Sequence, residues 1–133
     1  MKELVVDATV ENLSMVLDFI NAELEESDCP LKLQTSIEIA VEEIFVNIAN
    51  YAYKPEIGDA FVRVAVGDEV TIEFEDNGVP YNPLEKEDPD ITVSAAEREV
   101  GGLGIFMVKQ IMDSVEYRRE DGRNILMIRK AII

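Results

Sequence analysis

The sequence contains no histidine and only one cysteine, Cys29, among its 133 residues. Without histidine the chain cannot build a Ser–His–Asp triad or a histidine-based acid–base site, and one cysteine excludes internal disulfides and thiolate zinc sites. Basic residues are also few: 12 lysines and arginines stand against 28 acidic residues, which gives a formal charge of −16. Because nucleic-acid binding needs clustered cations, we expect no direct contact with nucleic acid.

Long hydrophobic runs are lacking as well, so we expect no membrane span. The first residues include Glu3 and Asp7 where a signal peptide would be apolar, which predicts a cytoplasmic protein. What is present is the composition of a globular chain, with 47% apolar and 30% charged residues. The length suits one domain, which we expect to occupy residues 1–133.

The hydrophobic pattern of the first half predicts one strand and two helices. Residues 2–9 predict a short edge strand, and the segment after them predicts a helix that Thr9 caps. A second helix, ending near Tyr53, carries an apolar stripe at helical spacing formed by Ile37, Val41, Ile44 and Ile48. Each helix therefore has one face to bury against a partner.

The second half predicts two β-hairpins separated by a loop and a helix. Residues 61–76 alternate as two strands around a Gly-Asp turn, and residues 114–133 do so around an Asp-Gly turn. Between them, residues 77–102 are rich in proline and acidic residues, which predicts a loop, and a helix begins at Gly104. This order predicts an α+β two-layer sandwich, with a mixed, mostly antiparallel sheet and three helices on one face.

Two polar motifs interrupt the apolar pattern. Glu43 and Asn47 lie four residues apart on one face of the second helix, at the margin of its apolar stripe. Alone, such a pair is more often a solvated helix surface than a site. Asp76 shares the inward parity of its strand, and burying a carboxylate is costly unless hydrogen bonds are donated to it. Asp76 is therefore either the anchor of an Asp-x-Gly turn or a ligand contact.

A third motif, Gly-Gly-Leu-Gly, opens the third helix. Glycines at Gly102 and Gly104 would let bare N–H groups approach phosphate oxygens. A flexible hinge or close helix packing would explain a lone glycine cluster equally well. The three motifs occurring together, in this order, favour a nucleotide site over these local explanations.

The motifs Glu43-x-x-x-Asn47 and Asp76-x-Gly78-x-Pro80, with the glycine box, resemble the ordered boxes of the GHKL ATPase and kinase superfamily, which has the Bergerat ATP-binding fold. More narrowly, NGVPYNP and GGLGIFMVKQIMDSVEY resemble the bacterial anti-sigma-factor serine/threonine kinases. The likeness covers roughly residues 8–130. Tyr51, where many relatives have a histidine, and the acidic loop are departures from the family pattern.

The resemblance implies that the chain binds ATP or ADP together with Mg²⁺. Asn47 resembles the residue that ligates Mg²⁺, and Glu43 resembles the general base that accepts the proton of an attacking serine or threonine hydroxyl. Asp76 resembles the adenine reader, which accepts a hydrogen bond from the exocyclic amine, while Gly78 keeps the pocket floor free of a side chain. Residues 82–101 resemble a mobile ATP lid.

Phosphate binding is the least specific part of the resemblance. The residues it implies for this role are Gly102, Leu103 and Gly104 of the glycine box, with Arg98 or Lys109 as cationic contacts.

As partners, the resemblance implies a sigma factor and an antagonist protein that the chain phosphorylates, and it implies a homodimer. Phosphorylation of the antagonist would then control how much sigma factor is available. A nucleotide-gated module that sequesters partners without phosphorylating them is the alternative. An α/β sandwich that binds no nucleotide would need all three motifs to coincide by chance.

Overall fold

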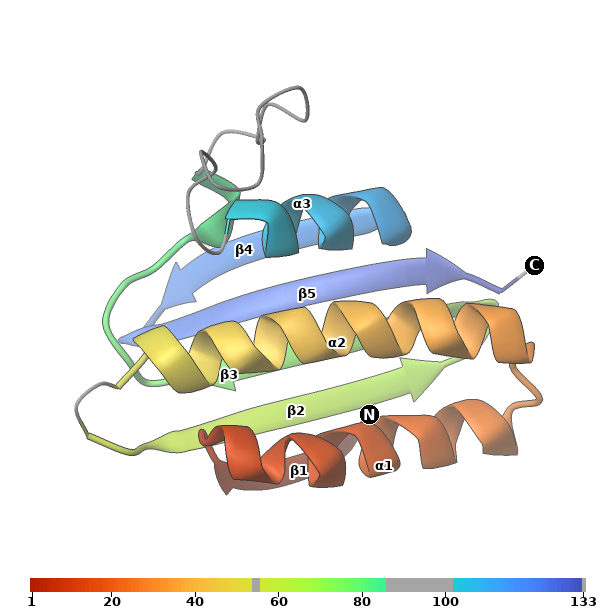
Figure 1. The fold of residues 1–133 in the computed structure, drawn as a ribbon, viewed down its shortest axis with the longest axis horizontal. Coiled ribbons are helices and arrows are strands. Elements are labelled where there is room, and N and C mark those ends of the chain that lie inside the picture. The colour runs from red at the N-terminus through yellow and green to blue at the C-terminus, as the bar shows by residue number, and fades with distance from the viewer. Residues whose placement is uncertain (54–55, 86–101, 133) are drawn as a thin grey trace.

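The computed structural model describes residues 1–53, 56–85 and 102–132. In this part of the chain a β-sheet and a layer of helices lie face to face (Figure 1). The strands are β1 Lys2–Asp7, β2 Asp59–Val66, β3 Glu69–Asp76, β4 Ser114–Glu120 and β5 Arg123–Ala131. The α-helices are α1 Leu13–Glu26, α2 Leu31–Tyr51 and α3 Gly102–Ile111, and two short 3₁₀-helices are η1 Val10–Asn12 and η2 Pro83–Glu85.

The described strands form one sheet in the order β1-β2-β3-β5-β4. Each neighbouring pair is antiparallel, so the sheet contains no parallel pair in the described ranges, where the sequence predicted a mixed sheet with mostly antiparallel strands. The turn between β4 and β5 has positive φ at Asp121 (51°) and Gly122 (78°), the backbone that a two-residue hairpin requires. The predicted α+β two-layer fold is confirmed.

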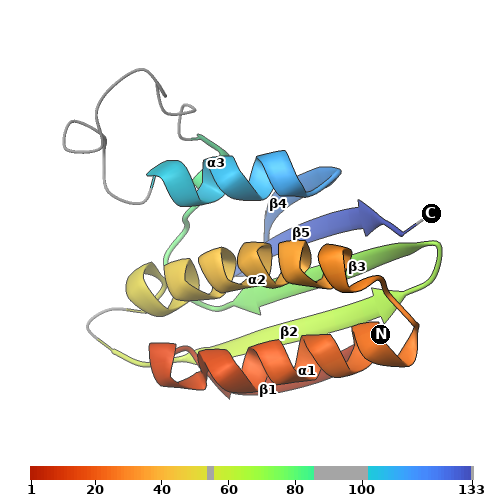
Figure 2. The same ribbon diagram turned by 45° about the vertical axis from the view of Figure 1, so that its right-hand side comes forward.

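All three helices cover the same face of the sheet, as the two views in Figures 1 and 2 show. Their apolar stripes and the inward-facing strand residues together bury one core. Its largest fully buried side chains include Phe45, Phe74, Ile20, Leu24, Ile37, Ile72 and Ile128. None of the helices in the described ranges combines the length and hydropathy that a membrane span needs.

The other face of the sheet carries a network of ion pairs. Arg63 of β2 contacts Glu3 of β1 at 2.6 Å, and Glu73 and Glu75 of β3 at 3.1 and 3.2 Å. Arg123 of β5 reaches Glu75 from the other side at 3.4 Å. Glu75 is consequently only 5% exposed, although its strand parity points it away from the helices.

Element boundaries differ from the sequence prediction at several places. β1 ends at Asp7 rather than at residue 9, β2 begins at Asp59 rather than at residue 61, and η2 lies within the predicted loop. Thr9 precedes η1 rather than α1, and its side chain makes no capping hydrogen bond. The second helix ends at Tyr51, two residues earlier than expected. The third helix begins at Gly102, two residues earlier than predicted, so both Gly102 and Gly104 lie within its first turn. Helix ends depend on caps and packing that periodicity does not encode.

Candidate functional site

A cavity lies at one end of the helix layer, where α2 and β3 end and β5 begins. Apolar side chains such as Ile44, Ile48 and Leu126 form most of its wall. The polar residues that line it are Asn47, Tyr51, Asp76, Tyr81, Tyr117 and Asn124. Its volume is ≈ 40 Å³, room for a few water molecules. An apolar pocket with a few convergent polar groups is the usual form of a small-molecule site.

Asp76 is the carboxylate of this cavity. The strand period carries it inward from β3, and it is 5% exposed. Its Oδ1 accepts hydrogen bonds from the Gly78 N–H and from the Asn124 amide, both at 2.9 Å. Within the described ranges no residue donates to Oδ2. One oxygen therefore anchors the Asp-x-Gly turn while the other stays available to a ligand, so the two explanations offered by the sequence are compatible.

The environment of Asp76 opposes its ionisation. Burial raises the pKa of Asp76 above its ordinary value, and the hydrogen bonds from Asn124 and Gly78 and the charge of Arg119 act in the opposite direction. A carboxylate that keeps a free oxygen in such a cavity is a strong hydrogen-bond acceptor for an amine.

Gly78 is needed because the chain passes directly against the end of α2. A Cβ at this position would lie 2.2 Å from the carbonyl oxygen of Ala52, and the neighbouring Val79 N–H donates to that same oxygen at 3.0 Å. Close backbone contacts thus help to hold the segment that follows β3 against the end of α2. The steric constraint on Gly78 therefore comes from the Ala52 backbone, and its predicted role at the floor of a base pocket stays a prediction.

Asn47 and Glu43 lie on the part of α2 that faces the cavity and α3. Asn47 lines the cavity itself. Glu43 lies one turn earlier, where its Oε2 would be 2.5 Å from a Cβ placed on Gly104. The carboxylate therefore rests against the first turn of α3, and a glycine at 104 leaves room for it. The structure brings together Glu43, Asn47, Asp76, Gly78 and Gly104 at one end of the fold.

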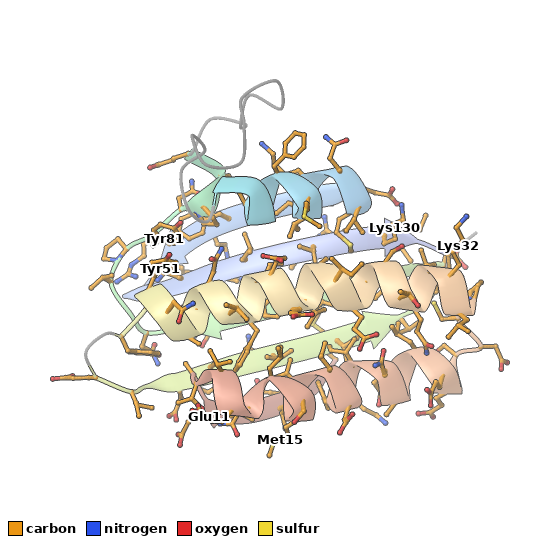
Figure 3. The ribbon with its side chains drawn as sticks, in the orientation of Figure 1. Glu11, Met15, Lys32, Tyr51, Tyr81 and Lys130 are labelled. Carbon is orange, nitrogen blue, oxygen red and sulfur yellow. The ribbon has the colours of Figure 1, made fainter. Side chains whose placement is uncertain are left out.

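Two tyrosines lie at the cavity and contact each other. Tyr51 ends α2, Tyr81 lies between β3 and η2, and their rings stack with centroids 5.9 Å apart and planes 29° from parallel. Figure 3 shows the two side chains next to each other at the end of the molecule opposite Lys130. Tyr51 is 45% exposed, so the pair stands between the cavity and solvent. The sequence identified Tyr51 only as a departure from the family pattern.

Asn124 is a functional candidate that the sequence analysis missed. It is 6% exposed and lines the cavity beside Asp76. The signal was available, because Asn124 shares the inward parity of Leu126 and Ile128 in β5. Its position next to the Asp-Gly turn made it look like part of that turn.

The remaining predicted phosphate contacts are less well placed or undescribed. Lys109 lies in the last turn of α3, about 10 Å along the axis from Gly102, so the structure does not bring it to the glycine box. Gly102 and Leu103 lie in the first turn of α3. Arg98 and most of the predicted lid, residues 86–101, lie outside the described residues.

The residues present fit a metal ion that takes few of its ligands from the protein. Within the described ranges no three His, Cys, Asp or Glu side chains form a cluster that could enclose an ion. Mg²⁺ commonly takes one or two protein oxygens and completes its octahedron with water and phosphate. The carboxamide oxygen of Asn47, at the cavity wall, fits that mode.

Known proteins are similar to this chain in sequence over about two thirds of its length or more. The chain is similar to the serine-protein kinase RsbW of Bacillus cereus, with 31% identity over 96 residues that cover 68% of this chain and 60% of that relative. It is also similar to the serine/threonine-protein kinase BtrW of Bordetella bronchiseptica, with 26% identity over 100 residues, 73% of this chain and 70% of that relative. The chain spans about 60% of the length of the RsbW relative.

Solved structures share the fold. The crystal structure of the RsbU and RsbW domains of Rv1364c from Mycobacterium tuberculosis superposes with a TM-score of 0.69 and 15% identity, over 99% of this chain and 33% of that one. The histidine kinase domain of a blue-light activated histidine kinase from Erythrobacter litoralis gives a TM-score of 0.57 and 20% identity, over 77% of this chain and 46% of that one. Residues 6–130 match the family model described as the histidine kinase-like ATPase domain. The chain therefore belongs to the histidine kinase-like ATPase domain family, as its three motifs predicted.

Proposed function

We propose that the chain binds ATP and ADP with Mg²⁺ and acts as a serine/threonine kinase on an antagonist protein, thereby controlling the availability of a sigma factor. The family is one of ATPase-type domains, and the curated relatives RsbW and BtrW are named as serine and serine/threonine protein kinases. The observation that carries the proposal is that Asn47 and Asp76 line one cavity, while Glu43, one helical turn before Asn47, lies against Gly104.

In this proposal the free Oδ2 of Asp76 accepts the exocyclic amine of adenine. Guanine presents a carbonyl at the same place, which a carboxylate repels. The apolar wall around Ile44 and Leu126 would hold the flat base. Because the cavity is smaller than a nucleobase, the base enters when the stacked rings of Tyr51 and Tyr81 move apart.

Glu43 and Asn47 take different roles. Asn47 would hold Mg²⁺ through its carboxamide oxygen, without adding charge to a chain that is already acidic. Bound Mg²⁺ supplies positive charge that offsets the triphosphate. Glu43, one turn away and beside the first turn of α3, would accept the proton of the partner's attacking hydroxyl.

Nucleotide selectivity is the first test. Calorimetry in the presence of Mg²⁺ should show that ADP binds at least about tenfold more tightly than GDP, which corresponds to roughly 1.4 kcal/mol. Equal affinities for the two nucleotides would refute the adenine assignment to Asp76.

Phosphotransfer is the second test. The purified chain is mixed with radiolabelled ATP, Mg²⁺ and antagonist proteins encoded near its gene, and transfer to serine or threonine is measured. Glu43→Gln should bind ATP normally but transfer phosphate about 10²-fold more slowly or worse, because the amide cannot take up a proton. The matched control is Glu42→Gln, an exposed neighbour on the same helix that should keep the wild-type rate.

Asn47 should fail in a different way from Glu43. Asn47→Ala should lose Mg²⁺-dependent nucleotide affinity, because the substitution removes the protein oxygen that the proposal assigns to the metal. Asn21→Ala in α1 is the control. If Asn47→Ala binds Mg·ATP like the wild type, the metal assignment is wrong. If Glu43→Gln transfers phosphate at the wild-type rate, Glu43 is not the general base. If no antagonist accepts phosphate from the wild type, the alternative of a nucleotide-gated binding module without kinase activity replaces the kinase.

A further inference from the structure

Asn124 uses its whole hydrogen-bonding capacity at the bottom of the cavity. Its Nδ2 donates to Asp76 Oδ1 at 2.9 Å and to the Val79 carbonyl at 2.8 Å. Its Oδ1 accepts from the Tyr117 hydroxyl at 2.5 Å, from Arg119 Nη1 at 3.1 Å and from the Tyr81 N–H at 3.3 Å. One side chain of β5 thereby joins the end of β3, the segment 78–81 and the strand β4.

The chemistry of its neighbours fixes the orientation of this amide. The guanidinium of Arg119 and the backbone N–H of Tyr81 can only donate, so they must face the carbonyl oxygen of Asn124. The carbonyl of Val79 can only accept, so it must face the NH₂ group. Turning the amide over would oppose donors to donors on one side and acceptors to acceptors on the other. The NH₂ group is therefore permanently aimed at Asp76.

We infer that Asn124 is a positioning residue for base recognition: it holds Asp76 with Oδ1 occupied and Oδ2 presented to the ligand, and it ties this carboxylate to the backbone of Tyr81. This inference rests on the proposed role of Asp76 in reading adenine. Without the Asn124 amide, Oδ1 keeps only the Gly78 N–H, and the carboxylate can rotate about its terminal bond. The acceptor would then no longer be fixed where the base amine arrives.

Asn124→Asp is the sharpest variant, because it keeps the shape and replaces only the donor. The new side chain can still accept from Tyr117, Arg119 and the Tyr81 N–H, but it turns a second carboxylate oxygen toward Asp76. Two carboxyl groups at this distance share a proton, and they titrate as a pair. Among the described residues, the other charged or titratable groups around the pair include Glu75 of β3, Arg119 and Tyr117 of β4, Tyr53 after α2, and the cavity tyrosines Tyr51 and Tyr81.

The experiment measures ADP and IDP affinity for the wild type and for Asn124→Asp between pH 8 and pH 5.5. IDP has a carbonyl in place of the exocyclic amine, so it cannot donate the hydrogen bond that the proposal assigns to Asp76. At pH 8 the variant should bind ADP about tenfold or more weakly than the wild type, with little change for IDP. As the pH falls and the pair gains one proton, the introduced carboxyl group regains a donor and ADP affinity should recover toward the wild-type value.

The control for the added charge is Asn77→Asp, which places a carboxylate beside Asp76 in the chain but on an exposed side chain. It should change ADP affinity little and should show no acid recovery. If Asn124→Asp binds ADP like the wild type, or loses ADP and IDP equally at every pH, the positioning role is refuted.

A ligand-free readout separates this inference from the proposed function. The titration of Asp76, followed by NMR of its carboxyl carbon, should shift to higher pH in Asn124→Ala, because a hydrogen bond that favours the ionised form is lost. If wild-type protein binds no adenine nucleotide but this shift occurs, the proposed function fails while Asn124 still positions Asp76. If the titration of Asp76 is unchanged, the positioning role fails whatever the ligand.

Discussion

Adding a single methyl group at Gly78 tests whether the closeness of α2 and the segment after β3 supports the cavity. In Gly78→Ala the new Cβ would lie 2.2 Å from the Ala52 oxygen, 2.6 Å from its carbonyl carbon and 2.8 Å from its Cα. These are backbone atoms at the end of α2, so no side chain can swing away. The carbonyl must retreat by more than about 1 Å to reach ordinary contact distance.

The energetic cost follows from what that retreat breaks. Overpacking a closely packed site costs about 1–3 kcal/mol. The Ala52 carbonyl also accepts the Val79 N–H at 3.0 Å, and losing this hydrogen bond adds about 1 kcal/mol. We therefore expect Gly78→Ala to lower the free energy of unfolding by about 2–4 kcal/mol, a large part of the about 5–15 kcal/mol typical of a domain.

Urea unfolding followed by circular dichroism measures this loss, and calorimetry with ADP measures the effect on the site. ADP affinity should also fall, because the Gly78 N–H that holds Asp76 Oδ1 moves with the backbone. The matched control is Gly67→Ala in the turn between β2 and β3, where an added Cβ meets nothing within 4 Å. That variant should be neutral or more stable by about 0.4–1 kcal/mol, through the unfolded state.

A Gly78→Ala variant that unfolds at the wild-type urea concentration and binds ADP normally would show that the approach of the two backbones does not constrain the site. Equal destabilisation by Gly67→Ala would point to a general loss of glycine flexibility instead. Either result would refute the steric reasoning.

Three further substitutions give different signatures. Gly104→Ala should keep the free energy of unfolding within about 1 kcal/mol of the wild-type value, because alanine favours helix and only the end of the Glu43 side chain must move. Phosphotransfer should nevertheless drop, because the displaced group is the proposed general base. An unchanged transfer rate would contradict this expectation. Asp76→Asn should abolish the preference for ADP in calorimetry and stabilise the protein by about 0.5–2 kcal/mol at pH 7. Because burial raises the pKa of Asp76, stability present below the ordinary pKa of 3.8 is lost from the wild type as pH rises through the folded value. The urea midpoint of Asp76→Asn should therefore rise relative to that of the wild type as pH increases. A difference between the two midpoints that stays constant with pH would count against this reasoning. In Asp113→Ala the urea midpoint should be lower than that of the wild type at pH 7, because the hydrogen bond from the Ala131 N–H lowers the pKa of Asp113 and stabilises its ionised form. This stabilisation disappears as pH falls through the folded pKa, so the two midpoints should converge in acid. A difference that does not change with pH would exclude the linkage.

The sequence predicted the two layers of this fold because apolar residues recur with the helical period in the helices and alternate with polar residues in the strands. The hairpin of β2 and β3 alternates in step with burial, and the stripe of Ile37, Val41 and Ile44 is buried as expected. The Thr9 cap was wrong because a turn of 3₁₀-helix intervenes, and there Asn12, not Thr9, makes a side-chain hydrogen bond, to the Asp7 carbonyl. The deciding contact is local, but cap preference alone does not show that Asn12 will bond back to Asp7.

The site was predictable where one strand or one helix turn defines it, and less so where several strands meet. Parity alone placed Asp76 inside, and spacing alone paired Glu43 with Asn47. Asn124 had the same parity signal, but its partners come from β4 and from residues 78–81, which the sequence does not connect. The burial of Glu75 depends on β2 and β5 being its neighbours, which only the strand order reveals.

The two carboxylates that end β3 show why the cavity suits a ligand. Glu75 and Asp76 are equally buried, at 5% exposure, on opposite faces of the sheet. Glu75 is neutralised by two guanidinium groups, from Arg63 and Arg123, within 3.4 Å. From the residues that the structure describes, Asp76 receives only neutral N–H donors on one oxygen, while Arg119 donates to Asn124 and to the Gly78 carbonyl. A carboxylate already paired with arginine has little attraction left for a base amine. Burial without a cation is costly, and the open second oxygen of Asp76 is the acceptor that the proposed function assigns to the base amine.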